Sequence, residues 1–149
     1  MKILIVEDDS FKYSKVAELL REIFHDAELL HRDNVHGAIN YVRSESPDLI
    51  LLDMSLPSHP AVVGEGSPVS MPAGGIEIIL ELKMLKKIGI KTIVLTQYPD
   101  VEIEYEYYSI IDSERAIKSL YGMQALSVVH YDNDSNEWKD KLKNILTKS

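Results

Sequence analysis

The hydrophobic positions of this chain fall into short continuous runs separated by longer segments. Apolar residues fill four of these runs without regular polar alternation, which is typical of strands covered on both faces of a parallel sheet. The four runs are residues 3–6, 49–52, 92–95 and 126–129. Residues 27–31 form a weaker fifth run, which we place near a sheet edge.

The segments between these runs have a helical period. Apolar residues recur at i, i+3, i+4 and i+7 in residues 16–24 and 138–146, which predicts two amphipathic helices. Residues from about 34 to 44 and from 75 to 87 also read as helices. The whole is a strand-helix unit repeated five times, so we expect a parallel sheet with helices on both faces. Such sheets bind ligands beyond the carboxyl ends of their strands.

Two segments depart from this alternation. Residues 57–75 are rich in glycine, proline and serine and predict a long loop, either a lid or docking element or an insertion without a role. In residues 97–111, acidic residues alternate with apolar and aromatic ones, which predicts an extended, half-exposed ribbon. We favour a solvated edge strand here over a partner-binding surface. Both segments are expected as additions to one domain over residues 1–149.

Composition narrows the classes of function. The 149 residues include 16 Lys and Arg against 24 Asp and Glu, a net charge of −8, and no cysteine. This excludes a disulfide framework, a thiolate nucleophile and cysteine-bound zinc, and the acidity argues against direct binding to nucleic acid. The chain has no apolar leader and no apolar stretch near the roughly 20 residues that span a bilayer. We therefore expect a soluble cytoplasmic protein without membrane contact.

Acidic side chains follow two strands that are neighbours in the expected sheet. Glu7 and Asp8 come directly after the first strand, and Asp53 comes directly after the third. Crowded carboxylates repel one another, so either one takes up a proton or a divalent cation neutralises them. Ligands that are all oxygen favour Mg²⁺. We assign helix capping to Asp9 or Ser10 and metal binding to Asp8.

Thr96 directly follows the run over residues 92–95 and places a hydroxyl at the same edge of the sheet. Taken together, the segments KILIVEDD (2–9), DLILLDMSLP (48–57) and IVLT (93–96) make the chain resemble the receiver domain of bacterial two-component response regulators. The resemblance implies an α/β, flavodoxin-like, doubly wound fold. Its five-stranded parallel sheet, of order 2-1-3-4-5, would lie in the middle of three α/β/α layers.

The resemblance also implies a phosphorelay function. Asp53 would accept a phosphoryl group from a histidine kinase or phosphotransfer protein, and Thr96 would switch a surface toward a downstream protein. Asp8, Asp53 and the backbone carbonyl of Ser55 would hold Mg²⁺, with Glu7 acting through a coordinated water. Such a domain is no enzyme beyond assisting its own phosphorylation and dephosphorylation. A homodimer is a further option for its assembly.

The chain departs from the family at the fifth strand. Receivers normally have a lysine at its end that pairs with the phosphoryl group, and here Tyr131 takes that position, or His130 if the register slips by one. Gln97 stands where a small residue is usual and would narrow access to Asp53. The alternative is therefore a pseudo-receiver that binds proteins independently of phosphorylation. A magnesium-dependent phosphohydrolase is a third reading, against which the absence of a second aspartate two residues after Asp53 argues.

Overall fold

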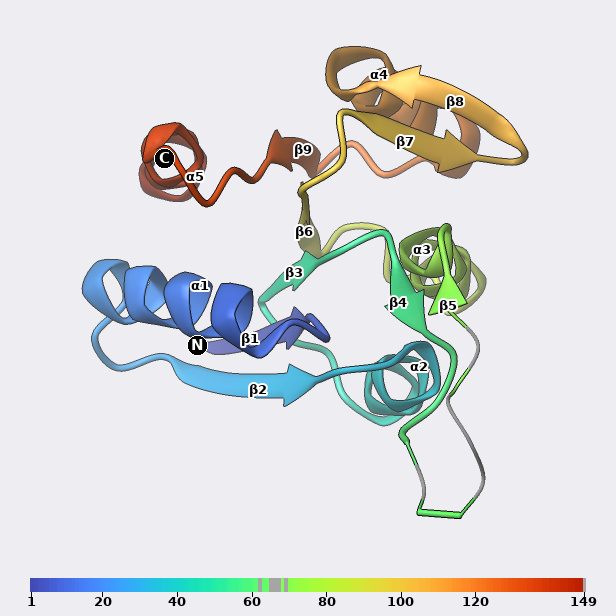
Figure 1. Cartoon of the computed structure of the whole chain (residues 1–149), viewed down its shortest axis with the longest axis horizontal. Helices are drawn as coiled ribbons and strands as arrows, with labels where there is room; N and C mark the ends of the chain where they lie inside the picture. The colour runs from blue at the N-terminus through green and yellow to red at the C-terminus, as the bar shows by residue number, and fades with distance from the viewer. Residues whose placement is uncertain (62, 65–67, 69, 149) are drawn as a thin grey trace.

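The computed structural model describes residues 1–61, 63–64, 68 and 70–148. A five-stranded parallel sheet forms its centre, with the order β2-β1-β3-β6-β9 (Figure 1). Its strands are β1 (Lys2–Val6), β2 (Glu28–Arg32), β3 (Leu49–Leu52), β6 (Lys91–Thr96) and β9 (Leu126–His130). In the order of these five strands along the chain, this is the predicted 2-1-3-4-5 topology, and the expected doubly wound fold is confirmed.

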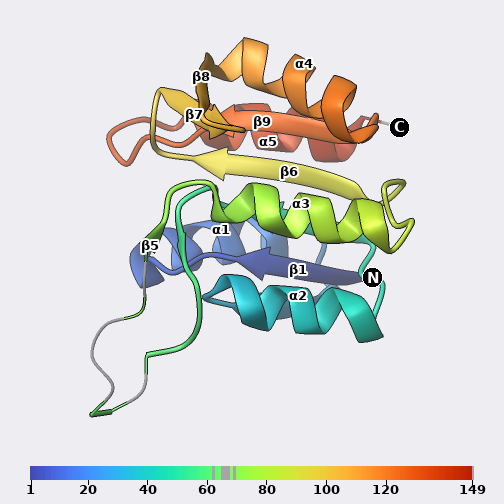
Figure 2. The same ribbon diagram turned by 90° about the vertical axis from the view of Figure 1, so that its right-hand side faces the viewer.

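Five helices cover the two faces of the sheet (Figure 2). On one face lie α1 (Ser10–Ile23) and α5 (Glu137–Thr147), whose apolar residues join those of the strands in one buried cluster. Trp138 belongs to this cluster, as its helical spacing predicts. On the other face lie α2 (Val35–Ser44), α3 (Gly74–Met84) and α4 (Ile110–Tyr121), which enclose a second cluster. The central strands are thus covered on both faces, which explains their continuous apolar runs.

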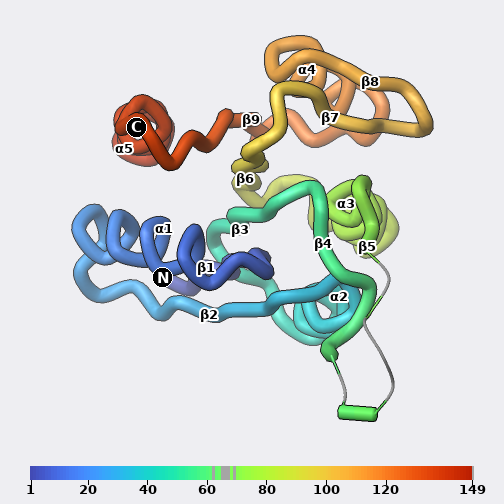
Figure 3. The backbone as a smooth tube through the Cα atoms, viewed as in Figure 1, coloured from blue at the N-terminus to red at the C-terminus, as the bar shows by residue number. Residues whose placement is uncertain are grey.

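The segment after β6 contains the extended, half-exposed ribbon that its alternation predicts, but the place of this ribbon in the fold differs from the prediction. Its alternating residues form a separate antiparallel hairpin of β7 (Asp100–Ile103) and β8 (Glu106–Ser109), not an edge strand of the main sheet. Val101 and Ile103 are buried, and the hairpin packs beside α4 (Figure 3). The prediction of a solvated edge strand is wrong because the apolar face of this ribbon is covered by a helix rather than by the sheet.

The two ends of the predicted loop over 57–75 are paired with each other. The short strands β4 (Leu56–Pro57) and β5 (Ser70–Met71) pair antiparallel, and α3 begins at Gly74. Part of the predicted loop, residues 62, 65–67 and 69, lies outside the described residues. In the part of the chain that the structure describes, no helix is long and apolar enough to cross a membrane.

Candidate functional site

An acidic cavity opens at the carboxyl ends of β1 and β3. Because the two strands pair in parallel, with Val6 opposite Leu52, the residues that follow them meet at one edge. Ligand oxygens of Glu7, Asp8 and Asp53 all lie within 4.8 Å of one another, as their positions after the strands predict. The cavity has a volume of about 130 Å³ and is lined by Glu7, Asp8, Asp9, Asp53, Ser55, Gln97 and Tyr98.

The backbone holds Asp53 in place. Its own N–H donates to the Val6 carbonyl at 3.1 Å, and its Oδ1 accepts from the Met54 N–H at 2.7 Å. The second oxygen, Oδ2, is thereby left to face other groups of the site. Only 4% of Asp53 is exposed, and burial raises the pKa of its carboxyl, against the lowering influence of the nearby Lys12 ammonium.

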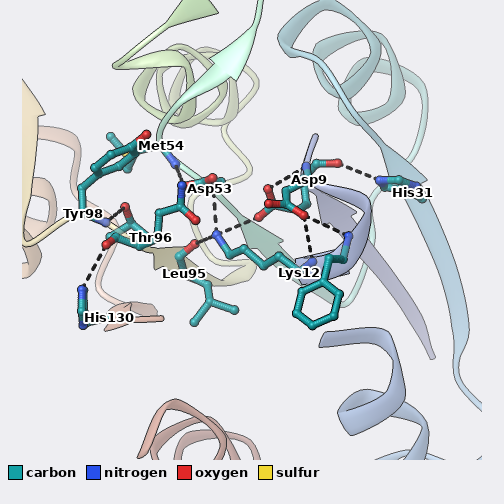
Figure 4. A network of polar contacts seen from close by, with 12 residues as sticks. Asp9, Lys12, His31, Asp53, Met54, Leu95, Thr96, Tyr98 and His130 are labelled. Atoms are coloured by element: carbon teal, nitrogen blue, oxygen red, sulfur yellow. Dashed lines mark hydrogen bonds and ion pairs between the residues drawn. The ribbon is translucent and has the colours of Figure 1, made fainter. Parts of the chain in front are cut away.

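Sequence reasoning missed Lys12, which enters this site from α1. Its Nζ donates to the Leu95 carbonyl at 2.6 Å and forms ion pairs with Glu7 Oε1 at 2.7 Å and Asp53 Oδ2 at 3.3 Å (Figure 4). The Lys12 side chain is 2% exposed. A signal was present in the sequence, because Lys12 lies four residues before Val16 and so continues the apolar face of α1.

The start of α1 explains why Lys12 reaches the carboxylates. The Asp9 side chain caps the helix and accepts from the N–H groups of Phe11 and Lys12, which confirms one of the two expected capping residues. Lys12 therefore lies in the first turn, and helical side chains lean toward the helix N-terminus. The Lys12 side chain thus points along the sheet edge toward Glu7 and Asp53.

Both carboxyl oxygens of Glu7 have partners within the site, and the pKa of its carboxyl is raised. Its Oε1 accepts from Lys12, and its Oε2 accepts from the Asp9 N–H at 3.2 Å. Burial raises the pKa of Glu7 to about 7, with Lys12 lowering it and Asp53 raising it further. When all three carboxylates are ionised, the one ammonium leaves two negative charges uncompensated in this cluster of oxygen ligands. These residues therefore fit a divalent cation of the Mg²⁺ type.

The other predicted residues divide into two groups. Thr96 is buried beside the cavity, and its Oγ1 accepts from the Tyr98 N–H at 3.3 Å, while Gln97 lines the cavity itself. His130 instead makes a hydrogen bond with the Gln97 carbonyl at 3.2 Å. Tyr131 is buried against Trp138, with ring centroids 4.8 Å apart. Neither is among the residues that line the acidic cavity.

Comparisons with known proteins extend these observations. No family model matches the chain. It is 43% identical over 146 residues to the Detocs response regulatory protein DtcB of Vibrio alginolyticus, which covers 97% of this chain and 98% of that protein. It is also 31% identical over 107 residues to sporulation initiation phosphotransferase F of Bacillus subtilis, covering 70% of this chain and 71% of the relative.

Solved structures show the same fold. The phosphorylated cyanobacterial phytochrome response regulator RcpA matches with a TM-score of 0.64 and 22% identity, over 97% of this chain and 89% of its own. TrrA of Thermotoga maritima, in complex with Mg²⁺ and beryllium fluoride, matches with a TM-score of 0.57 and 23% identity, over 97% of each chain. The sheet order and the two curated relatives lead to one conclusion: this chain belongs to the response regulators and has a receiver domain.

Proposed function

We propose that this protein is a phosphorelay receiver that takes a phosphoryl group on Asp53. The observation that carries the proposal is the position of Asp53 at the end of a central strand, facing a polar cavity beside two further carboxylates. In the transfer, an Asp53 oxygen attacks phosphorus and the bond from phosphorus to the donor atom breaks. The donor leaves with the electron pair, and Asp53 becomes an acyl phosphate. A phosphohistidine of a histidine kinase or phosphotransfer protein is the expected donor.

Mg²⁺ fits the same cavity, where Glu7, Asp8, Asp53 and the Ser55 backbone carbonyl would hold it. When bound, it would neutralise charge on the transferring phosphoryl group. The structures of TrrA with Mg²⁺ and beryllium fluoride and of Rcp1 with Mn²⁺ support a divalent ion by analogy of fold. The protein's own backbone orients the phosphoacceptor, because the Met54 N–H donates to Asp53 Oδ1. In this proposal the protein turns over no other substrate.

Thr96 connects the site to an output surface. Its hydroxyl accepts from the Tyr98 N–H, and the hairpin of β7 and β8 begins two residues after Tyr98. A phosphoryl group on Asp53 would offer the Thr96 hydroxyl a charged acceptor, and rotation of the Thr96 side chain toward it would move Oγ1 away from the Tyr98 N–H. The hairpin carries the exposed side chains of Tyr105 and Tyr107. We infer that this hairpin and the adjoining α4 form the surface that contacts a downstream protein.

The test is labelling by a small phosphodonor. The wild-type protein, incubated with Mg²⁺ and acetyl phosphate, should gain the mass of one phosphoryl group, and Asp53→Asn should gain none. Asp26→Asn, which changes an exposed aspartate in the turn before β2, should be labelled like the wild type. Asp8→Ala should weaken Mg²⁺ binding and slow labelling. An unlabelled wild type, or labelling that survives Asp53→Asn, would refute the proposal.

One observation favours the pseudo-receiver as a second candidate. Lys12 already pairs with Glu7 and Asp53, so part of the charge that a metal would neutralise is balanced within the chain. A pseudo-receiver would bind its partner equally well before and after treatment with acetyl phosphate, and equally well as Asp53→Asn. The labelling experiment, followed by partner binding with both samples, separates the two functions.

A further inference from the structure

We propose that Lys12 is the phosphoryl-binding lysine of this protein, and that α1 supplies the cation that other receivers place at the end of their last strand. The inference rests on the proposed function of Asp53 and deepens it by naming a further residue that contacts the transferred group. The structure offers four observations in its favour, which concern geometry, charge, position in the helix and the neighbouring aromatic ring.

The geometry places the ammonium directly against the phosphoacceptor. Lys12 Nζ lies 3.3 Å from Asp53 Oδ2, on the carboxyl oxygen that does not accept from the Met54 N–H. Lys12 Nζ donates a hydrogen bond to the Leu95 carbonyl and forms ion pairs with Glu7 and Asp53, so that three contacts hold it. The ammonium is thus fixed in direction before any phosphoryl group arrives. Such preorganisation is the main means by which proteins assist phosphoryl transfer.

The charge balance changes when Asp53 reacts. As a carboxylate, Asp53 carries the negative charge that pairs with Lys12. As an acyl phosphate, its carboxyl group is neutral and the negative charge resides on the phosphoryl oxygens bonded to it. Glu7 still pairs with Lys12 at 2.7 Å, but because Lys12 is buried, water cannot replace the anion lost at Asp53, and removing one charge partner from a buried ion is costly. The ammonium therefore follows the charge onto the phosphoryl group, which is covalently attached to the carboxyl that it already contacts.

The position of Lys12 in its helix is otherwise unfavourable. A cation in the first turn faces the positive end of the helix dipole, and burial removes its hydration. The same position continues the apolar face of α1, where a leucine or methionine would pack without these costs. A lysine at this position is explained by a function of the site in binding anionic groups.

Tyr131 stands at the position where receivers normally carry their lysine, and it lies beside Lys12. It stands at the end of β9, and its ring centroid lies 5.3 Å from Lys12 Nζ. Its N–H donates to the Thr96 carbonyl at 2.7 Å, so this end of β9 adjoins the same site. An aromatic ring therefore covers the lysine that comes from α1. The two positions, 12 and 131, face each other, and a lysine can be moved from one to the other in an experiment.

The experiment compares two affinities of the full-length protein, for Mg²⁺ alone and for beryllofluoride in the presence of Mg²⁺. Lys12→Met should weaken beryllofluoride binding about 10- to 100-fold, the effect of losing a hydrogen bond to a charged group. The same change removes a positive charge from the carboxylates and should tighten Mg²⁺ binding about tenfold. A residue with only a structural role would weaken both. Lys15→Met, on the same helix but outside the acidic cavity, should change neither affinity.

A double variant tests the exchange itself. Lys12→Met combined with Tyr131→Lys returns the cation to the end of β9 and should recover at least tenfold of the lost beryllofluoride affinity. If Lys12→Met does not fold, the wild type with ¹⁵N-labelled lysine replaces it. Beryllofluoride should then shift the Lys12 ammonium resonance and leave that of Lys15 in place, and an unmoved Lys12 resonance overturns the proposal.

The outcomes distinguish this proposal from the function on which it rests. A wild type that neither becomes labelled by acetyl phosphate nor binds beryllofluoride refutes the receiver function, and this inference with it. A wild type that is labelled, alongside a folded Lys12→Met with unchanged beryllofluoride affinity, refutes the role of Lys12 alone. Opposite changes in the two affinities, with recovery in the double variant, support it.

Discussion

Gly75 allows α3 to begin directly against the phosphoacceptor. A Cβ at this position would lie 2.7 Å from the Asp53 backbone oxygen and 2.7 Å from Leu52 Cδ1. The Gly75 N–H donates to the Met54 carbonyl at 2.9 Å, which ties the helix start to the residue that orients Asp53. At the scale of single residues, the shape of the site thus depends on the absence of a side chain as much as on the carboxylates.

Gly75→Ala should therefore lower the free energy of unfolding by about 1 to 3 kcal/mol, the usual cost of overpacking. It should also slow labelling of Asp53, because the backbone that carries the carboxyl must shift. Urea denaturation and the acetyl phosphate assay measure the two effects. Gly89→Ala is the matched control, since a Cβ there meets no atom within 4 Å and should leave both quantities unchanged.

Gln97 is one of the residues that line the acidic cavity. We expect its amide to narrow the path by which water reaches an acyl phosphate on Asp53, and we therefore predict a slow loss of label from the wild type. Gln97→Ala should shorten the half-life of the phosphorylated protein by up to about tenfold, which corresponds to about 1.4 kcal/mol of barrier. Mass spectrometry after removal of acetyl phosphate follows the decay. Loss of label from the wild type within seconds would contradict the prediction.

At the scale of elements, the hairpin of β7 and β8 forms a small sheet of its own, separate from the five-stranded sheet. Its turn residues, Glu104 and Tyr105, both have positive φ, at 51° and 71°, a conformation that side chains disfavour. The Tyr121 hydroxyl of α4 donates to Glu104 Oε1 at 3.1 Å and joins the turn to the helix. The hairpin is therefore tied to α4.

Tyr121→Phe should loosen the hairpin and lower the free energy of unfolding by about 1 kcal/mol. Burial, together with the bond to Glu104, raises the pKa of Tyr121 from 10.0 to about 12. Between these values the folded protein keeps a proton that the unfolded chain releases. The stability that Tyr121 contributes is thus fully present below pH 10 and is lost as the pH rises through 12.

Urea denaturation across this pH range checks the prediction. The wild type should lose stability more steeply than Tyr121→Phe, which has no hydroxyl to titrate. Tyr107→Phe, which changes an exposed tyrosine of the same hairpin, should behave like the wild type. Parallel pH profiles for the wild type and Tyr121→Phe would contradict the role given to this hydrogen bond.

At the scale of the whole molecule, the end of β6 links the acidic cavity to the opposite part of the fold. Lys12 donates to the Leu95 carbonyl, and the next residue, Thr96, carries the hydroxyl that accepts from Tyr98. The chain then continues through Pro99 into β7, which packs on α4. We therefore expect a change of charge on Asp53 to be transmitted along this short segment to the hairpin.

Thr96→Ala should uncouple these two parts. Asp53 should still be labelled, but the amide resonances of the hairpin should lose most of the shift that beryllofluoride causes in the wild type. This corresponds to the loss of one hydrogen bond to a charged group, about a tenfold change in the switching equilibrium. Thr92→Ala, at the other end of β6, serves as the control. Hairpin shifts of wild-type size in Thr96→Ala would exclude Thr96 as the link.

The local sequence predicted much of the sheet and its acidic edge. Continuous apolar runs indicated buried parallel strands, and parallel pairing necessarily brings the residues after β1 and β3 together. Glu7, Asp8 and Asp53 therefore meet where their places along the chain predicted. The position of the hairpin was harder to predict from the sequence. Period-two alternation indicates an extended ribbon, but it does not say whether the main sheet or α4 covers the apolar face of that ribbon.

The sequence by itself determined the five strands of the main sheet, most of the helices and the three carboxylates, because each depends on local periodicity or on a general rule of parallel sheets. The order of the strands followed from the resemblance to receiver domains. Only the tertiary structure decided where the cation of the site comes from. Lys12 Nζ donates to the carbonyl of Leu95, which is 83 residues away along the chain, and forms an ion pair with Asp53. An ion pair depends on distance in space, and no spacing along the chain encodes it.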